Sequence, residues 1–308
     1  MCIKERNASD STCKKLLRDK GCFADLCNYA FFQGRQVIQP EELVSRENDL
    51  STLIGNVDKP TEIKRYRDVV RKASIHGEYV IIGVEHQSTF DEKMIFRILN
   101  YDATIYINQV ESKQEIYPVG SFVFYTRDKE WKSPETLKET LKSIPPEMEP
   151  YINDWRLPVV ELKTMDARKL TNQRLKEVVE ISQSMFAGSY DGLRNNRKIE
   201  TESFMMAATF TRTKIKREDL PEGDEINMCE AMDRLFQRFE NQGMEKGKII
   251  GFEKGKSDTL KEQLKVKLGT LSRPLEKQLT NTSLEKLNEL TLNIFNVTSE
   301  EDVLRIIN

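Results

Sequence analysis

Several common signals are missing from this chain of 308 residues, and each absence excludes a class of protein. No apolar run approaches the roughly 18 residues that a membrane-spanning helix needs. The five cysteines are odd in number and scattered, without the paired C-x₂-C spacing of zinc sites. The first residues are polar and lack the apolar core of a signal peptide. We therefore expect a cytoplasmic protein with reduced thiols, no structural zinc and no membrane contact.

The most informative segment reads as one β-hairpin. Two strand-like runs flank the two-residue turn His76-Gly77, which fixes the register of the arms. Counting back along both arms puts Asp68 opposite Glu85, and Gln87 shares their face. Two facing carboxylates repel each other, and a hard divalent cation between them would remove the repulsion. The alternative is a pair of acids at the open end of a hairpin, where water screens them.

Two details of the second arm favour a functional site. Residues 80–84 are apolar at almost every position, so this arm is expected to be buried on both sides. Gly83 lies on the carboxylate face beside Glu85 and opens space there for a ligand. The register matters, because a one-residue slip would move one acid to the other face.

These residues also carry a resemblance. Asp68, a spacer of 16 residues and the pattern Glu85-x-Gln87 resemble the PD-(D/E)XK nuclease signature, with glutamine in place of the usual lysine. Five blocks resemble, in order, the recombination-promoting nuclease family, often labelled YhgA-like transposases: Phe23–Asn28, Tyr66–Val70, Gly83–Ser88, Met94–Asp102 and Glu130–Pro134. The resemblance spans roughly residues 14–190.

The resemblance implies a fold and an activity. The expected fold is α/β, with a PD-(D/E)XK restriction-endonuclease-like core (a mixed sheet flanked by helices) and an all-helical C-terminal extension. The expected activity is metal-dependent DNA endonuclease action, linked to recombination or mobile elements, with no small-molecule cofactor. A catalytically inactive DNA-binding or scaffolding protein that keeps the fold is the alternative.

One Mg²⁺ ion is the predicted cofactor, with Mn²⁺ or Ca²⁺ as alternatives. We expect Asp68, Glu85 and the backbone carbonyl of His86 to hold it. Gln87 is predicted to assist catalysis by donating a hydrogen bond to water or phosphate, because an amide does not titrate usefully. The side chain of His86 alternates to the opposite face and is expected to be structural. Asp25, on the first predicted helix, is a candidate third catalytic acid, with a capping or solvated aspartate as the alternative.

Contacts to DNA are predicted in two places. The net charge of −2 gives the whole chain no attraction for polyanions, but residues 59–72 hold six basic and two acidic residues. Within them Lys64, Arg65 and Arg67 are candidate DNA-binding residues, with a solvated charged surface as the alternative. Arg97 and Tyr101 lie one turn apart on a predicted helix and either face the site to bind phosphate or form a buried structural pair.

The sequence predicts three regions: a nuclease-like domain over 1–165, a helical extension over 166–222, and a helical arm rich in Gly, Lys and Glu over 223–308. Helices are expected at 13–33, 89–109, 166–188, 197–211, 226–256, 257–268, 283–293 and 299–307, and strands at 119–126 and 157–162. Four glycines recur every fourth residue from 243 to 255. Because each costs a helix about 1 kcal/mol against alanine, they suggest close helix–helix approach, and we predict a homo-oligomer through 226–260. Folding back onto the chain's own helices is the alternative.

Overall fold

The computed structural model describes residues 3–44, 69–113 and 115–308. The chain divides into two compact units, Met1–Met232 and Asp233–Asn308. The first unit contains both the predicted nuclease-like segment and the segment 166–222. No helix in the described ranges is long and apolar enough to cross a membrane.

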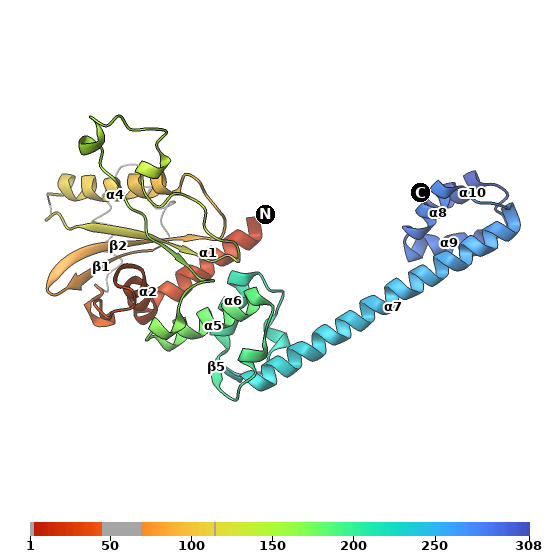
Figure 1. Ribbon diagram of the computed structural model, residues 1–308. Coiled ribbons are helices and arrows are strands. Elements are labelled where there is room, and N and C mark those ends of the chain that lie inside the picture. Colours follow the sequence, from red (N-terminus) through yellow and green to blue (C-terminus); the bar gives the residue numbers. More distant parts are fainter. Residues whose placement is uncertain (1–2, 45–68, 114) are drawn as a thin grey trace. The chain divides into compact units, whose positions relative to one another are not determined.

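A four-stranded mixed sheet forms the centre of the first unit (Figure 1). Its strands stand in the order β1 (Val69–Ile75), β2 (Glu78–Gln87), β3 (Val119–Tyr125) and β4 (Val159–Glu161). The pair β1–β2 is antiparallel, whereas β3 runs parallel to both β2 and β4. Helix α4 (Met94–Glu111) makes the crossover that a parallel β2–β3 pair requires. The predicted mixed α/β class is therefore confirmed.

The hairpin β1–β2 has the predicted register. His76 and Gly77 have φ angles of 52° and 88°, the two left-handed conformations of a type I′ turn. Pairing runs without a break from Ile75 opposite Glu78 to Val69 opposite Val84. The predicted partner of Glu85, Asp68, is the next residue along the first arm and lies outside the described residues.

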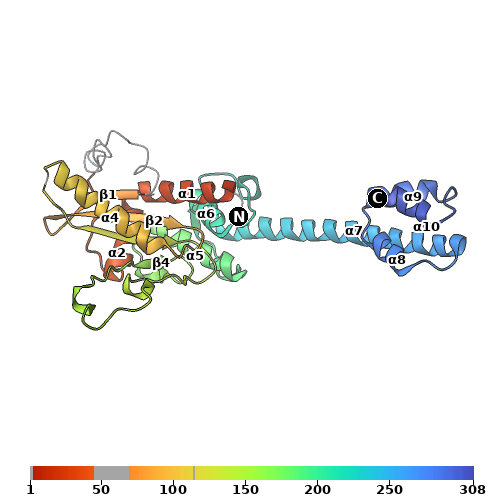
Figure 2. The same ribbon diagram turned by 90° about the horizontal axis from the view of Figure 1, so that it is seen from above.

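Helices cover both faces of the sheet (Figures 1 and 2). On one face lie α1 (Ile3–Arg18), α2 (Lys20–Phe32), α5 (Gln173–Ala187) and α6 (Thr201–Thr211). Their core includes the inward residues Ile82 and Val84 of β2 and Phe122 and Phe124 of β3. Helix α4 covers the other face, where Val123 and Tyr125 are buried against it. The sheet is thus the middle of three layers, and Glu85 alternates onto the α4 side.

The predicted single helix over 13–33 is two helices. Helix α1 already begins at Ile3, and the helical conformation is interrupted at Asp19. The carboxylate of Asp19 accepts a hydrogen bond from the N–H of Cys22 at 2.8 Å. This side chain caps α2, because aspartate competes with the backbone for such donors. The predicted end before Gly34 is confirmed, with Gln33 and Gly34 both at positive φ.

The rest of the first unit departs from an all-helical extension. A short strand, β5 (Lys198–Glu200), precedes α6 and pairs antiparallel with β6 (Glu225–Asn227). Helix α7 (Met228–Leu268) follows directly and continues through 41 residues, so the two helices predicted over 226–256 and 257–268 are one.

The second unit has its own core. It contains α7 from Asp233 onward, together with α8 (Arg273–Thr280), α9 (Leu284–Asn293) and α10 (Glu300–Ile307). Helices α9 and α10 match the sequence prediction, whereas α8 was not predicted. Ten apolar side chains are buried together: Leu260, Leu264, Leu271, Leu275, Leu279, Leu287, Leu290, Val297, Val303 and Ile307. The C-terminal region is therefore helical, as expected.

Candidate active site

Two of the predicted catalytic side chains meet at the end of β2. Glu85 and Gln87 alternate onto the same face of the sheet, and each residue is only 3 % exposed. The amide Nε2 of Gln87 donates to Oε1 of Glu85 at 3.2 Å. Because β2, β3 and β4 are parallel, their carboxyl ends share one edge, where Gln87 stands beside Tyr125 and Tyr125 beside Glu161. A buried carboxylate and a carboxamide thus lie together at this edge of the sheet.

Arg97 reaches this pair from α4. Its Nη2 donates to Oε1 of Glu85 at 2.7 Å, and its Nη1 donates to Oδ2 of Asp91 at 2.9 Å. Its Nε donates to the hydroxyl oxygen of Tyr101 at 3.3 Å. Arg97 therefore faces the predicted site, and Tyr101 supports it from the next turn of the helix. Their function in phosphate binding stays a prediction.

The charge of Arg97 is secured by its surroundings. Burial alone would lower the pKa of the guanidinium, but the hydrogen bonds with Tyr101 and Asp91 and the charge of Glu85 raise that pKa above its ordinary value. The arginine therefore stays charged at every pH at which the protein is folded. It supplies the positive partner that a buried carboxylate such as Glu85 requires.

Asp91 is a member of the site that sequence reasoning missed. Its Oδ1 accepts from the N–H of Lys93 at 3.0 Å, and its backbone carbonyl accepts from Oγ of Ser133 at 2.9 Å. The remaining oxygen, Oδ2, is bound by Arg97. No standard helical spacing relates residues 91 and 97, so only the loop conformation brings them together.

His86 points to the opposite face, as predicted. Its side chain is fully buried, with Nδ1 at 2.9 Å from Oδ1 of Asp10 and Nε2 at 2.8 Å from Oγ1 of Thr126. A second hydroxyl, from Ser9, lies 3.4 Å from Nε2. These contacts tie β2 to α1 and to the end of β3. The side chain is structural, whereas the proposed metal contact of its backbone carbonyl stays a prediction.

The structure does not bring Asp25 to Glu85. Asp25 lies on α2, across the sheet from α4, and is 2 % exposed. Its Oδ2 accepts from the N–H groups of Thr171 and Asn172, each at 2.9 Å, and its Oδ1 accepts from Nε2 of Gln36 at 3.0 Å. These bonds match the capping alternative, because they hold the chain at the start of α5.

Other predicted site residues lie outside the described residues: Lys64, Arg65, Arg67 and Asp68. Within the described ranges, no three His, Cys, Asp or Glu side chains are grouped so as to hold a metal ion. The donors that are present nevertheless suit magnesium, because Glu85 offers carboxylate oxygens and Gln87 an amide oxygen, and hard cations prefer such oxygens. The burial of Glu85 also calls for a positive charge beside it, which Arg97 provides here.

Comparison with known proteins gives one finding on this part of the chain. A family model described as "Putative transposase, YhgA-like" matches residues 61–208. The matched segment contains all four strands of the sheet, the hairpin, α4 and the residues Glu85, Gln87, Asp91 and Arg97, whereas Asp25 precedes it. No curated protein and no solved structure has a significant match to the chain.

Proposed function

We propose that this protein, whose residues 61–208 match the model of the YhgA-like putative transposase family, acts on DNA as a metal-dependent endonuclease connected with recombination or mobile elements. One observation carries the proposal. The hairpin register is as predicted up to Val69 opposite Val84, and Glu85 and Gln87 are buried on one face immediately beyond that pair. We predict that the same register continues by one more residue, which would put Asp68 across from Glu85.

The metal would be Mg²⁺, with Mn²⁺ or Ca²⁺ as substitutes, held by Asp68, Glu85 and the backbone carbonyl of His86. When bound, the ion lowers the pKa of a coordinated water and neutralises charge developing on the phosphorus. The protein's own groups do the rest. Gln87 orients the Glu85 carboxylate through its 3.2 Å hydrogen bond and can donate to a phosphate oxygen. Arg97 supplies a permanent positive charge at the same place.

DNA is the proposed partner of the face that carries these residues. Lys64, Arg65 and Arg67 precede β1 in the sequence, and a basic segment there would neutralise the phosphate backbone next to the site. Tyr101 supports Arg97 by accepting its Nε–H. Substituting one of the three basic residues should weaken binding to all DNA sequences equally and reduce its salt dependence, because phosphate contacts carry no sequence information.

A catalytically inactive DNA-binding or scaffolding protein is the second candidate. One observation favours it: Arg97 already neutralises the buried carboxylate of Glu85 through an ion pair at 2.7 Å, so this carboxylate is stable without a metal ion. The two candidates differ in whether a divalent cation makes the protein cut DNA.

A plasmid-nicking assay with purified full-length protein separates them. With Mg²⁺ we expect nicking that is abolished in Asp68→Ala and in Glu85→Ala. Gln87→Ala should nick more slowly but not stop, since a neutral hydrogen bond stabilises less than a metal ligand. The matched control is Glu180→Ala, which breaks a 2.7 Å ion pair with Arg197 elsewhere in the same unit and should nick normally.

Wild-type rates in Asp68→Ala would refute the site assignment. Circular dichroism should confirm that each variant is folded before its rate is compared. Tight DNA binding without nicking, in Mg²⁺, Mn²⁺ or Ca²⁺ alike, would establish the second candidate instead.

Helix α7 is the proposed surface for self-association, within the segment 226–260. An added Cβ would meet nothing within 4 Å at Gly243, Gly247, Gly251 or Gly255, so packing inside the described chain does not require these glycines. Phe236 and Ile250, on the same side of the helix as Gly243 and Gly247, are 42 % and 63 % exposed. Small residues beside exposed apolar ones allow a second helix to approach closely.

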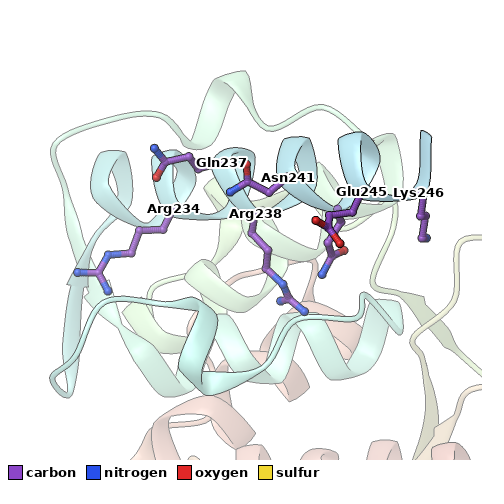
Figure 3. A pocket seen from close by; sticks show the side chains of 7 residues that line it. Arg234, Gln237, Arg238, Asn241, Glu245 and Lys246 are labelled. Atoms are coloured by element: carbon purple, nitrogen blue, oxygen red, sulfur yellow. The ribbon is translucent and has the colours of Figure 1, made fainter. Parts of the chain in front are cut away.

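The polar side of the same helix is distinct from this surface. Six labelled side chains of a polar pocket project from α7 in Figure 3: Arg234, Gln237, Arg238, Asn241, Glu245 and Lys246. With 3.6 residues per turn, Asn241 and Glu245 lie on the side of α7 opposite Phe236, Gly243, Gly247 and Ile250. Light scattering on the full-length chain should therefore show an oligomer that Ile250→Asp weakens and that a control, Gln237→Asp, does not. A monomer at tens of micromolar would contradict self-association and leave the fold-back alternative.

A further inference from the structure

We propose that Arg97 is a built-in counter-ion of the active site, which stands in for a divalent cation beside Glu85 and yields that place when the cation binds, while Asp91 keeps the arginine at the site. The inference rests on the proposed function only in taking a divalent cation as the ligand of Glu85. It also assigns a role to Asp91, which the sequence alone did not place at the site.

The buried carboxylate of Glu85 needs a positive charge beside it. The side chain of Glu85 is 4 % exposed, and a buried carboxylate is stable only when a positive group or several donors face it. Oε1 of Glu85 already accepts from both Arg97 and Gln87. A cation that binds this oxygen must displace at least one of these donors, and like charges favour displacing the arginine rather than the neutral amide.

Arg97 can give up its contact with Glu85 and still remain at the site. Each of its three nitrogens has a different partner: Glu85 for Nη2, Asp91 for Nη1 and Tyr101 for Nε. Losing the contact with Glu85 leaves two hydrogen bonds intact. Asp91 is itself fixed through the N–H of Lys93. The guanidinium therefore stays bound to Asp91 and Tyr101 when a cation takes its place at Glu85.

The ion pair of Arg97 and Asp91 is accessible to solvent. The side chains of Arg97 and Asp91 are each 30 % exposed, so the guanidinium reaches solvent although Glu85 does not. Once a cation neutralises Glu85, the released Nη2 presents its N–H groups to solvent at the edge of the site. An oxygen of a DNA phosphate is the acceptor that a released guanidinium binds best. Arg97 would thus neutralise Glu85 before the cation binds and would bind a DNA phosphate afterwards.

Metal binding tests this role directly, without reference to cleavage. Isothermal titration of the full-length protein with Mg²⁺ should give a dissociation constant about tenfold lower in Arg97→Met than in wild type, because a competing positive charge is gone. Thermal unfolding should show the same linkage. Arg97→Met should melt earlier than wild type in EDTA and regain most of the loss in Mg²⁺, whereas Arg97→Met/Glu85→Gln should gain nothing from Mg²⁺.

Arg174→Met is the matched control. Arg174 is 28 % exposed and is paired at 2.6 Å with Glu200, on the other side of the sheet from α4. Arg174→Met should have a lower melting temperature than wild type in EDTA, and Mg²⁺ should not restore it. An unchanged or weaker affinity for Mg²⁺ in Arg97→Met would overturn the counter-ion role, and so would an absence of Mg²⁺ binding by that variant.

The outcome is separable from that of the proposed nuclease activity. Tighter Mg²⁺ binding by Arg97→Met, with no DNA cleavage by the wild type, would keep the counter-ion and refute the nuclease. Cleavage by the wild type, with unchanged Mg²⁺ affinity in Arg97→Met, would do the reverse.

Discussion

Asp25 provides the sharpest test of how the site is assigned, because sequence and structure give it different roles. A third catalytic acid would place a negative charge beside the proposed cation, so its removal would weaken Mg²⁺ binding and cost little stability. In the structure it accepts hydrogen bonds from Gln36, Thr171 and Asn172 and joins α2 to the chain before α5. We therefore predict that Asp25→Ala is a stability variant that binds Mg²⁺ as the wild type does.

The expected loss follows from the bonds. A hydrogen bond to a charged group contributes about 1.5–3 kcal/mol, but bonds to one carboxylate are not additive, and the exposed Thr171 can recover water. We expect Asp25→Ala to cost about 3 kcal/mol in the free energy of unfolding. For a unit of this size that is a fall in melting temperature of roughly 6–12 °C. Asp25→Asn keeps an oxygen for the two N–H groups and should cost about 1 kcal/mol.

Differential scanning calorimetry and Mg²⁺ titration of the same samples decide the matter. Asp19→Ala serves as control, because Asp19 caps the same helix through one hydrogen bond, worth about 1 kcal/mol. Normal stability of Asp25→Ala together with lost Mg²⁺ binding would refute the structural reading and return Asp25 to the site.

Two further predictions concern the second unit. Leu264 is fully buried among its apolar residues, so Leu264→Ala should cost that unit about 3 kcal/mol; calorimetry should show its transition lowered and that of the first unit unchanged, and a shift of both would contradict independent cores. Hydrogen bonds from Lys265, Ser272 and Thr298 hold the pKa values of Glu276, Glu300 and Asp302 below their ordinary values. A carboxylate whose pKa is lower in the folded than in the unfolded state stabilises the folded state at any pH above its unfolded-state pKa, and this stabilisation is lost as the pH falls. The melting temperature of the second unit should therefore fall progressively below about pH 4. A melting temperature that stays constant from about pH 6 to 3 would exclude this effect.

The parts of the fold that sequence alone predicted are those fixed by neighbours in the chain. The turn His76-Gly77 needs two left-handed residues, and that local requirement set the register of the whole hairpin. The alternation of β2 then decided that Glu85 and Gln87 share one face while His86 takes the other. Each step used residues only a few positions apart, and no tertiary contact was needed.

The parts that sequence did not predict depend on distant partners. Asp25 meets Thr171 across 146 positions, and no spacing rule connects them. The strand β5 forms by pairing with β6, and its central residue Ile199 lies opposite Ile226, 27 positions further along the chain. The break at Asp19 was within reach, because an aspartate followed three residues later by a free backbone donor is a capping signal.

The two faces of β2 explain why a polar site can exist inside this sheet at all. Burying polar side chains is costly unless each has a partner. On one face, the His86 ring is bound by Asp10 and Thr126, which fasten the strand to α1 and β3. On the other face, Glu85 depends on Arg97 from α4. The first set of bonds needs no ligand and fixes the strand, whereas the second joins charged groups at the rim of the sheet. A cation that replaced Arg97 at Glu85, as we propose, would therefore leave in place the backbone that positions the carboxylate.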